Sequence, residues 1–196
     1  MIEVEQKFRL NPGDRERLME GAEFVSEKAL HDVYFDDNSL SLTTKDCWLR
    51  QRHGRWELKV PLSGGGKQRI STYRELETDE EIRACIGLAG VKPLGDELAE
   101  RGFVPFATID SKRTKYKHGN FIIDFDVWDF DYNVAEIELM VADETGIPTA
   151  RKRIQDFATE RGLVSNGVVF GKIIESIRRL RPEHFDRLVR AGVINT

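Results

Sequence analysis

The stretch IEVEQKF at residues 2–8 decides the fold of this chain, because apolar and polar residues alternate along it. The charged residues Glu3, Glu5 and Lys7 fall on one face of an extended strand, and the apolar residues fall on the other. We expect such a strand to bury its apolar face and to keep an ionisable face on its other side.

The same alternation recurs along the chain and predicts further strands. It is strong in residues 47–52, 56–60, 121–127 and 134–141, and weaker in 32–36, 71–77 and 107–117. The step His53-Gly54-Arg55 between two of these segments is typical of a hairpin turn. Most strands therefore carry one apolar and one ionisable face.

Helix signals lie between and after the strands. Asn11 followed by Pro12 predicts a helix over 12–20, and Thr78 with Glu81 predicts a capping box for a helix that ends near Gly87. Further helices are predicted over residues 94–101, 148–161 and 168–180, and from residue 182 onward. Antiparallel strands mixed with helices indicate an α+β fold, which we expect to form a single domain over residues 1–196.

The composition is rich in charge but nearly balanced in sign. Charged residues make up 33% of the 196 residues, with 30 Lys and Arg against 34 Asp and Glu. A nucleic-acid-binding protein usually has a basic excess, and a disordered tail carries blocks of one sign. We therefore expect no nucleic-acid partner, and the balanced excess of charge needs another explanation.

The sequence also disfavours disulfide-rich, zinc-binding, membrane-spanning and secreted proteins. Cys47 and Cys85 match no CxxC spacing and cannot form a disulfide framework, and the four scattered histidines do not suggest a zinc site. No run of 18 apolar residues occurs, and the N-terminus does not resemble a signal peptide. We expect a cytoplasmic protein with no membrane partner, monomeric, with a flexible loop at residues 63–67.

The acids on the ionisable faces come in doublets two residues apart. These doublets are Glu3/Glu5, Asp124/Asp126 and Glu136/Glu138. Two acids at this spacing share a strand face at roughly 7 Å and repel each other unless a cation lies between them. Three doublets suggest a hard divalent ion, Mg²⁺ or Mn²⁺, although a half-buried sheet with a charged solvent face would look similar.

The bases are grouped on other segments. Arg50 and Arg52 share one strand, Lys59 lies on the next, and Lys7 and Arg113 lie elsewhere. Arginine pairs match phosphate oxygens, and a metal combined with a cationic clamp suits phosphoryl transfer. If the strands closed into a barrel, one wall would hold metal and another would clamp an anion.

The ordered set of motifs resembles the CYTH family, also called triphosphate tunnel metalloenzymes. The set comprises the ExExK strand at 3–7, WLRQR at 48–52, WELK at 56–59, YREL at 73–76, Lys112-Arg113, DFD at 124–126, EIE at 136–138 and Lys172. The resemblance implies an eight-stranded antiparallel β-barrel that forms a tunnel, with helices packed outside it. The segments 32–36 and 180–185 resemble the branch of the family that hydrolyses thiamine triphosphate with Mg²⁺.

The resemblance also implies roles for individual residues. Metal would be held by Glu3, Glu5, Asp124, Glu136 and Glu138, with help from Asp126. The triphosphate would be bound by Lys7, Arg50, Arg52, Arg113 and Lys172. Lys59 with Tyr34 would handle the proton, on condition that their pKa values are lowered. Trp48 would face the thiazolium cation, and Glu75 would complement its charge.

Alternatives remain open at this point. Relatives use the same tunnel to hydrolyse inorganic tripolyphosphate or RNA 5′-triphosphates, or to cyclise ATP. A non-catalytic polyphosphate-binding module and an ordinary scaffold with a charged surface are further readings. Lys115, in phase with Arg113, is expected to be solvated, and Glu57 is expected to pair with Lys59.

Overall fold

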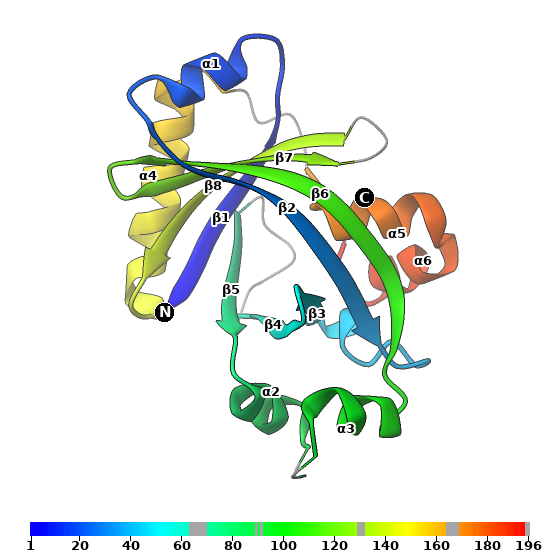
Figure 1. The fold of residues 1–196 in the computed structure, drawn as a ribbon. Coiled ribbons are helices and arrows are strands. Elements are labelled where there is room, and N and C mark those ends of the chain that lie inside the picture. Colours follow the sequence, from blue (N-terminus) through cyan, green and yellow to red (C-terminus); the bar gives the residue numbers. More distant parts are fainter. Residues whose placement is uncertain (63–69, 89, 91, 129–131, 164–168, 195–196) are drawn as a thin grey trace.

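Eight antiparallel strands close into a barrel in the computed structural model, which describes all residues except 63–69, 89, 91, 129–131, 164–168 and 195–196 (Figure 1). The strands are β1 (Ile2–Arg9), β2 (Glu23–Asp36), β3 (Trp48–Arg52), β4 (Arg55–Pro61), β5 (Ile70–Leu76), β6 (Val104–His118), β7 (Phe121–Trp128) and β8 (Tyr132–Val141). Their order around the barrel is β1-β5-β4-β3-β2-β6-β7-β8, and β8 pairs with β1 to close it. The predicted α+β fold with an eight-stranded antiparallel barrel and outer helices is thereby confirmed.

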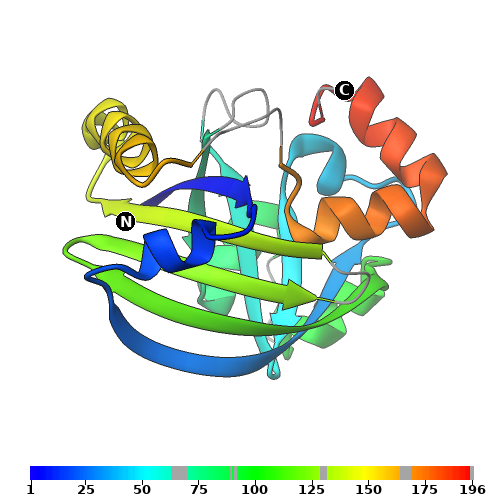
Figure 2. The ribbon, with the colours of Figure 1, turned by 90° about the horizontal axis from the view of Figure 1, so that it is seen from above.

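The helices lie outside the barrel (Figure 2). They are α1 (Asp14–Met19), α2 (Asp79–Ile86), α3 (Leu94–Glu100), α4 (Ile147–Glu160), α5 (Lys172–Leu180) and α6 (Pro182–Arg190), with short 3-10 helices η1 (Thr43–Lys45) and η2 (Glu144–Gly146). None of the helices in the described ranges is both long and apolar enough to span a bilayer.

The apolar faces of the strands are buried against these helices in three separate clusters. Val4 of β1 packs with Ile154 of α4, and Leu58 of β4 packs in a second cluster with Ile82 of α2 and Leu98 of α3. A third cluster joins the β6 side of the barrel to α5 and α6. Because the apolar side chains point outward to the helices, the barrel interior is left to the ionisable faces.

The short-range signals of the sequence are mostly borne out. Thr78 and Glu81 form the capping box of α2, and Gly87 ends this helix with φ +71°. The hairpin between β3 and β4 turns through His53 and Gly54, both with positive φ. These elements were predicted within a few residues of their observed bounds.

Three element bounds differ from the predictions. Asn11 is not the cap of α1, which begins two residues later than expected after Gly13, and the backbone N–H of Asn11 instead donates to the Asp14 carboxylate. Helix α5 begins at Lys172, later than the expected start at 168. Strand β2 begins at Glu23, well before the predicted residue 32, and the predicted loop at 63–67 lies outside the described residues.

Candidate functional site

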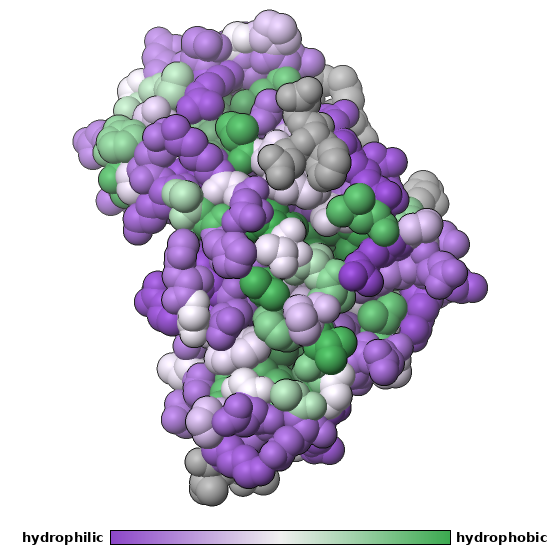
Figure 3. Space-filling view, turned by 45° about the vertical axis from the view of Figure 1, so that its right-hand side comes forward, coloured by the Kyte–Doolittle hydropathy of each residue, from purple (hydrophilic) through white to green (hydrophobic). Residues whose placement is uncertain are grey.

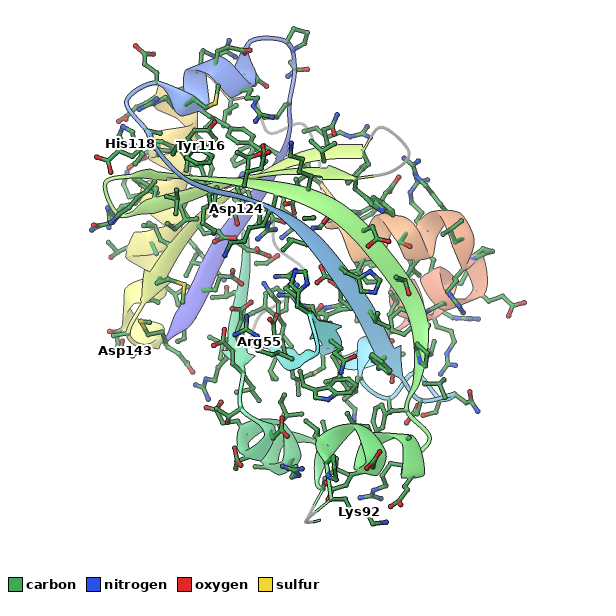
Figure 4. All side chains as sticks on the ribbon, in the orientation of Figure 1. Arg55, Lys92, Tyr116, His118, Asp124 and Asp143 are labelled. Carbon is green, nitrogen blue, oxygen red and sulfur yellow. The ribbon has the colours of Figure 1, made fainter. Side chains whose placement is uncertain are left out.

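A cavity of about 330 Å³ fills the barrel interior. Thirteen of the fifteen residues singled out from the sequence line it: Glu3, Glu5, Lys7, Tyr34, Trp48, Arg50, Arg52, Lys59, Glu75, Arg113, Glu136, Glu138 and Lys172. The other two, Asp124 and Asp126, are buried behind this lining on β7, and Figure 4 labels Asp124 among the side chains inside the barrel. The ionisable strand faces therefore converge on one cavity.

Strand register brings the acids together. Glu5 pairs with Glu138 across β1 and β8, and Asp124 pairs with Glu136 across β7 and β8. As a result, carboxylate oxygens gather within 4.8 Å of one another in two groups, Glu3/Glu5/Glu138 and Asp124/Glu136/Glu138. Glu138 belongs to both groups and is the centre of the acidic wall.

The clustered carboxylates, which we call the acidic wall, are not fully neutralised by neighbouring bases. Glu138 makes no ion pair with any residue in the described ranges. Burial, followed by repulsion from Glu3, Asp124 and Glu136, raises the pKa of Glu138 well above its ordinary value. The buried Oδ1 of Asp124 has no hydrogen-bond partner. Grouped carboxylate oxygens with these properties fit a hard divalent cation such as Mg²⁺ or Mn²⁺.

The bases lie around and between these acids on the cavity lining, and each is held by an acid. Arg52 donates from Nε and Nη2 to the two carboxylate oxygens of Asp32 at 2.5 and 2.7 Å. Arg50 donates to Glu57 at 2.7 Å, so Glu57 pairs with Arg50 rather than with Lys59 as expected. Bidentate contacts of this kind fix the planes of the guanidinium groups.

Lys59 of β4 lies between acids of two other strands. Its Nζ lies 2.6 Å from Glu3 and 3.0 Å from Glu75. Burial disfavours the ammonium, but Glu3, Glu5 and Glu75 outweigh it and hold the pKa of Lys59 well above its ordinary value. The surrounding side chains therefore do not supply the lowered pKa that proton abstraction by Lys59 would need.

Arg113 and Lys172 meet at Asp126. Arg113 contacts Asp126 through two nitrogens, at 2.7 and 2.6 Å, and also contacts Asp124 and Glu136. Lys172 lies 2.9 Å from Asp126 and donates to Ser111 at 2.9 Å. Asp126 thus positions two cations and belongs to neither carboxylate group.

The start of α5 brings Lys172 into the barrel. Gly171 precedes it, and a Cβ at this glycine would lie 3.1 Å from Cε of Lys7. The small residue lets the helix approach the inner wall, so that Lys172 is only 8% exposed. A helix contributes to a site that is otherwise built from strands.

Tyr34 and Trp48 add aromatic surface to the cavity. Tyr34 of β2 pairs with Arg50 of β3, and Trp48 of β3 pairs with Lys59 of β4. Both aromatic side chains are buried and line the cavity. Strand β3 separates Tyr34 from Lys59, so their joint action as a dyad stays a prediction.

Several cavity residues were not predicted from the sequence. Lys115 is not solvated as expected: it lines the cavity, and its Nζ lies 2.9 Å from Asp124. Its two-residue spacing from Arg113 could have revealed it, as the spacing of Asp32 from Tyr34 could have revealed Asp32, the partner of Arg52. Asp46 and Tyr73 also line the cavity, and only the three-dimensional structure brings them together.

Comparisons with known proteins agree with this geometry. The family model described as CYTH domain matches residues 1–168. Thiamine-triphosphatase from Homo sapiens is 32% identical over 210 residues, covering 98% of this chain and 91% of the human protein. The corresponding protein from Macaca fascicularis is 31% identical, with the same coverage.

Solved structures share the fold. The PH1819 protein from Pyrococcus horikoshii OT3 has a TM-score of 0.62 at 20% identity, over 91% of this chain and 99% of that one. The Hippeastrum protein HpAC1, for which a dominant triphosphatase activity is described, has a TM-score of 0.57 at 18% identity, over 90% of this chain and 95% of that one. The matched family model and the two mammalian relatives cover most of the sequence, and the chain therefore belongs to the CYTH family.

Proposed function

We propose that this protein hydrolyses thiamine triphosphate to thiamine diphosphate and phosphate in a reaction that depends on Mg²⁺. The observation that carries the proposal is a single cavity lined by two groups of clustered carboxylates and by arginines and lysines, with Trp48 beside them. The identity of 32% to human thiamine-triphosphatase supports the choice of substrate.

The proposed metal ligands are the two carboxylate groups of the acidic wall. Glu3, Glu5, Asp124, Glu136 and Glu138 would hold Mg²⁺, directly or through water, and Asp126 would assist by holding its cationic neighbours. A bound Mg²⁺ supplies charge neutralisation for phosphate oxygens and lowers the pKa of a coordinated water.

The arginines and lysines of the cavity are proposed to bind the triphosphate. They are Lys7, Arg50, Arg52, Arg113 and Lys172, to which we add Lys115. These side chains orient the phosphate chain and neutralise the charge that develops during transfer, which is most of what phosphoryl transfer requires of a protein.

Lys59 and Tyr34 are the proposed proton-handling pair. With its pKa held high by neighbouring acids, Lys59 is an ammonium that can neutralise the charge on the leaving phosphate oxygen, and it would transfer its proton once bound metal lowers that pKa. Trp48 and Glu75 would receive the organic part of the substrate, since an indole face and a carboxylate both attract a thiazolium cation.

The proposal extends to the surroundings of the enzyme. We propose a cytoplasmic monomer that acts on a small molecule and has neither a nucleic-acid nor a membrane partner. Two unpaired cysteines and an acidic net charge of -4 support this.

A substrate panel tests the function. Phosphate release is measured with Mg²⁺ from thiamine triphosphate, inorganic tripolyphosphate and ATP, with EDTA as the metal-free control, and cyclic AMP is measured alongside. We expect thiamine triphosphate to give the highest kcat/KM, and Lys59→Ala and Glu5→Ala to abolish turnover. Faster turnover of tripolyphosphate would assign the protein as an inorganic tripolyphosphatase, and intact thiamine triphosphate would refute the proposal.

A further inference from the structure

Asp46 occupies a costly position at the edge of the cavity. It directly follows η1 and has φ +61°, in the left-handed region that non-glycine residues seldom adopt. It is only 7% exposed, and no ion pair to it occurs among the residues that the structure describes. Burial raises the pKa of Asp46. A buried carboxylate without a cation destabilises the folded state, and hydrogen bonds to it offset part of that cost.

The carboxylate of Asp46 holds two aromatic side chains of the cavity wall. Its Oδ1 accepts from Nε1 of Trp48 at 2.9 Å and from the hydroxyl of Tyr73 at 3.0 Å, and Oδ2 lies 3.2 Å from the same hydroxyl. Trp48 belongs to β3 and Tyr73 to β5, which are not neighbours in the barrel because β4 lies between them. One side chain thus ties together two rings from separate strands.

These rings stand next to the proposed proton-handling residue. Trp48 pairs in register with Lys59, and Nζ of Lys59 lies 5.8 Å from the centre of the Tyr73 ring. The χ2 angle of a tryptophan has a broad energy well, so packing alone leaves the indole some freedom. The bond from Nε1 to Asp46 removes this freedom.

We propose that Asp46 is a positioning residue that fixes the rings of Trp48 and Tyr73 on the cavity wall and thereby favours a triphosphate that carries a cationic heterocycle over bare tripolyphosphate. The selection rests on the proposed function, since it assumes turnover of thiamine triphosphate. Among the described residues, Asp46 makes no ion pair or hydrogen bond with the two carboxylate groups or with the proposed phosphate-binding bases. We therefore expect its effect to fall mainly on the organic part of the substrate, with a smaller effect through the contact of Tyr73 with Lys59.

The kinetic test compares two substrates in three variants. Asp46→Gly removes the carboxylate and suits the positive φ, whereas Asp46→Asn keeps an acceptor oxygen and tolerates the same backbone. Asp143→Asn is the matched control, because Asp143 also flanks a 3-10 helix but lies at the periphery (Figure 4). We expect Asp46→Gly to raise KM for thiamine triphosphate about tenfold, which corresponds to about 1.4 kcal/mol.

The same variant should leave kcat/KM for tripolyphosphate within about twofold of wild type, which a tenfold effect on one substrate makes easy to resolve. Asp46→Asn should recover most of the KM, and the control should change neither substrate. An equal loss on both substrates, or no loss on either, would overturn the proposal, because the residue would then be structural or dispensable.

A spectroscopic measurement separates this inference from the proposed function. The chain has three tryptophans, so the ¹H–¹⁵N spectrum contains three indole signals, and Trp48→Phe assigns one of them. We expect Asp46→Gly to shift and broaden the Trp48 signal and Asp143→Asn to leave it in place. If wild type fails to hydrolyse thiamine triphosphate, the proposed function and the selection fail together. An unmoved Trp48 signal would refute the positioning role alone.

Discussion

At the scale of single residues, we predict that Lys115 contributes to triphosphate binding in the cavity. Its ammonium lines the cavity and pairs with Asp124. A hydrogen bond to a charged group contributes about 1.5–3 kcal/mol, so Lys115→Ala should raise KM for tripolyphosphate roughly tenfold or more. Steady-state kinetics measure this. Lys112→Ala is the control, since Lys112 pairs with Glu27 and is exposed. Equal effects of the two variants would contradict a cavity role for Lys115.

We predict that ionised Glu138 lowers the free energy of unfolding when no metal is bound. Burial raises its pKa in the folded state, so the folded protein binds the proton more tightly than the unfolded chain does. Stability therefore falls as pH rises from the ordinary pKa of a glutamate toward this raised value. We expect Glu138→Gln to raise Tm in EDTA at neutral pH and to have little effect near about pH 3, below the ordinary pKa of a glutamate, where both states are protonated.

Calorimetry with Glu144→Gln as a surface control measures this difference. Since Glu144 is exposed, its replacement should change Tm little at either pH. The same Glu138→Gln variant should lose Mg²⁺-dependent turnover, because Glu138 belongs to both carboxylate groups. If Glu138→Gln instead lowered Tm at neutral pH, the prediction would be wrong, because the ionised carboxylate would then stabilise the folded protein.

At the scale of elements, α2 depends on its capping box, and none of its residues lines the cavity. The Thr78 hydroxyl accepts from the N–H of Glu81, and the Glu81 carboxylate accepts from the N–H of Thr78. Losing such a cap costs about 1 kcal/mol, so Thr78→Ala should lower Tm by about 2–4 °C with kcat unchanged. Thr159→Ala, on the exposed side of α4, should leave both nearly unchanged. A matching fall in the control would argue against the cap.

Elements were predictable from the sequence where one face is buried. Strands β1, β7 and β8 each have an apolar face under a helix or in the core, and this burial imposes the period-two pattern. The first half of β2 carries exposed residues on both faces, including Phe24 and Val25, so no alternation marks it. At α1, Gly13 provides the left-handed turn, a geometry that the Asn11-Pro12 signal does not specify.

The site was predictable to the extent that it follows strand phase. Charged residues two apart on a strand share a face, which placed most of the cavity lining. Contacts across the barrel depend on which strands are neighbours, and that order was available only through the family resemblance. Asp46 lies in no strand, so its contact with Tyr73, 27 residues away, carries no periodic signal.

At the scale of the whole molecule, the near-balance of charge has two components. The face in Figure 3 has mostly hydrophilic side chains at its margins, so some of the charged residues lie on the surface. Inside, acids and bases face each other and pair, as Lys59 does with Glu3 and Lys172 with Asp126. When no ligand is bound, the acids and bases of the cavity therefore neutralise one another.

This internal pairing predicts that cation and triphosphate bind cooperatively. Mg²⁺ on the carboxylates would release Lys59 and Arg113 for phosphate, and phosphate on the bases would release Glu3 and Asp124 for Mg²⁺. The coupling is reciprocal by linkage. A ligand at about 100 times its Kd stabilises by about 2.7 kcal/mol, so each alone should raise Tm by several degrees. Together they should raise it by more than the sum of the two shifts.

Thermal melts with Mg²⁺, with tripolyphosphate and with both measure the coupling. Mg²⁺ also binds tripolyphosphate in free solution, which could mimic cooperativity. Glu138→Gln controls for this, because complex formation in solution is the same for both proteins whereas the variant lacks the carboxylate shared by both groups. We expect the variant to keep the shift with tripolyphosphate alone and to lose the excess. The same excess in both proteins would place the coupling in solution rather than in the barrel.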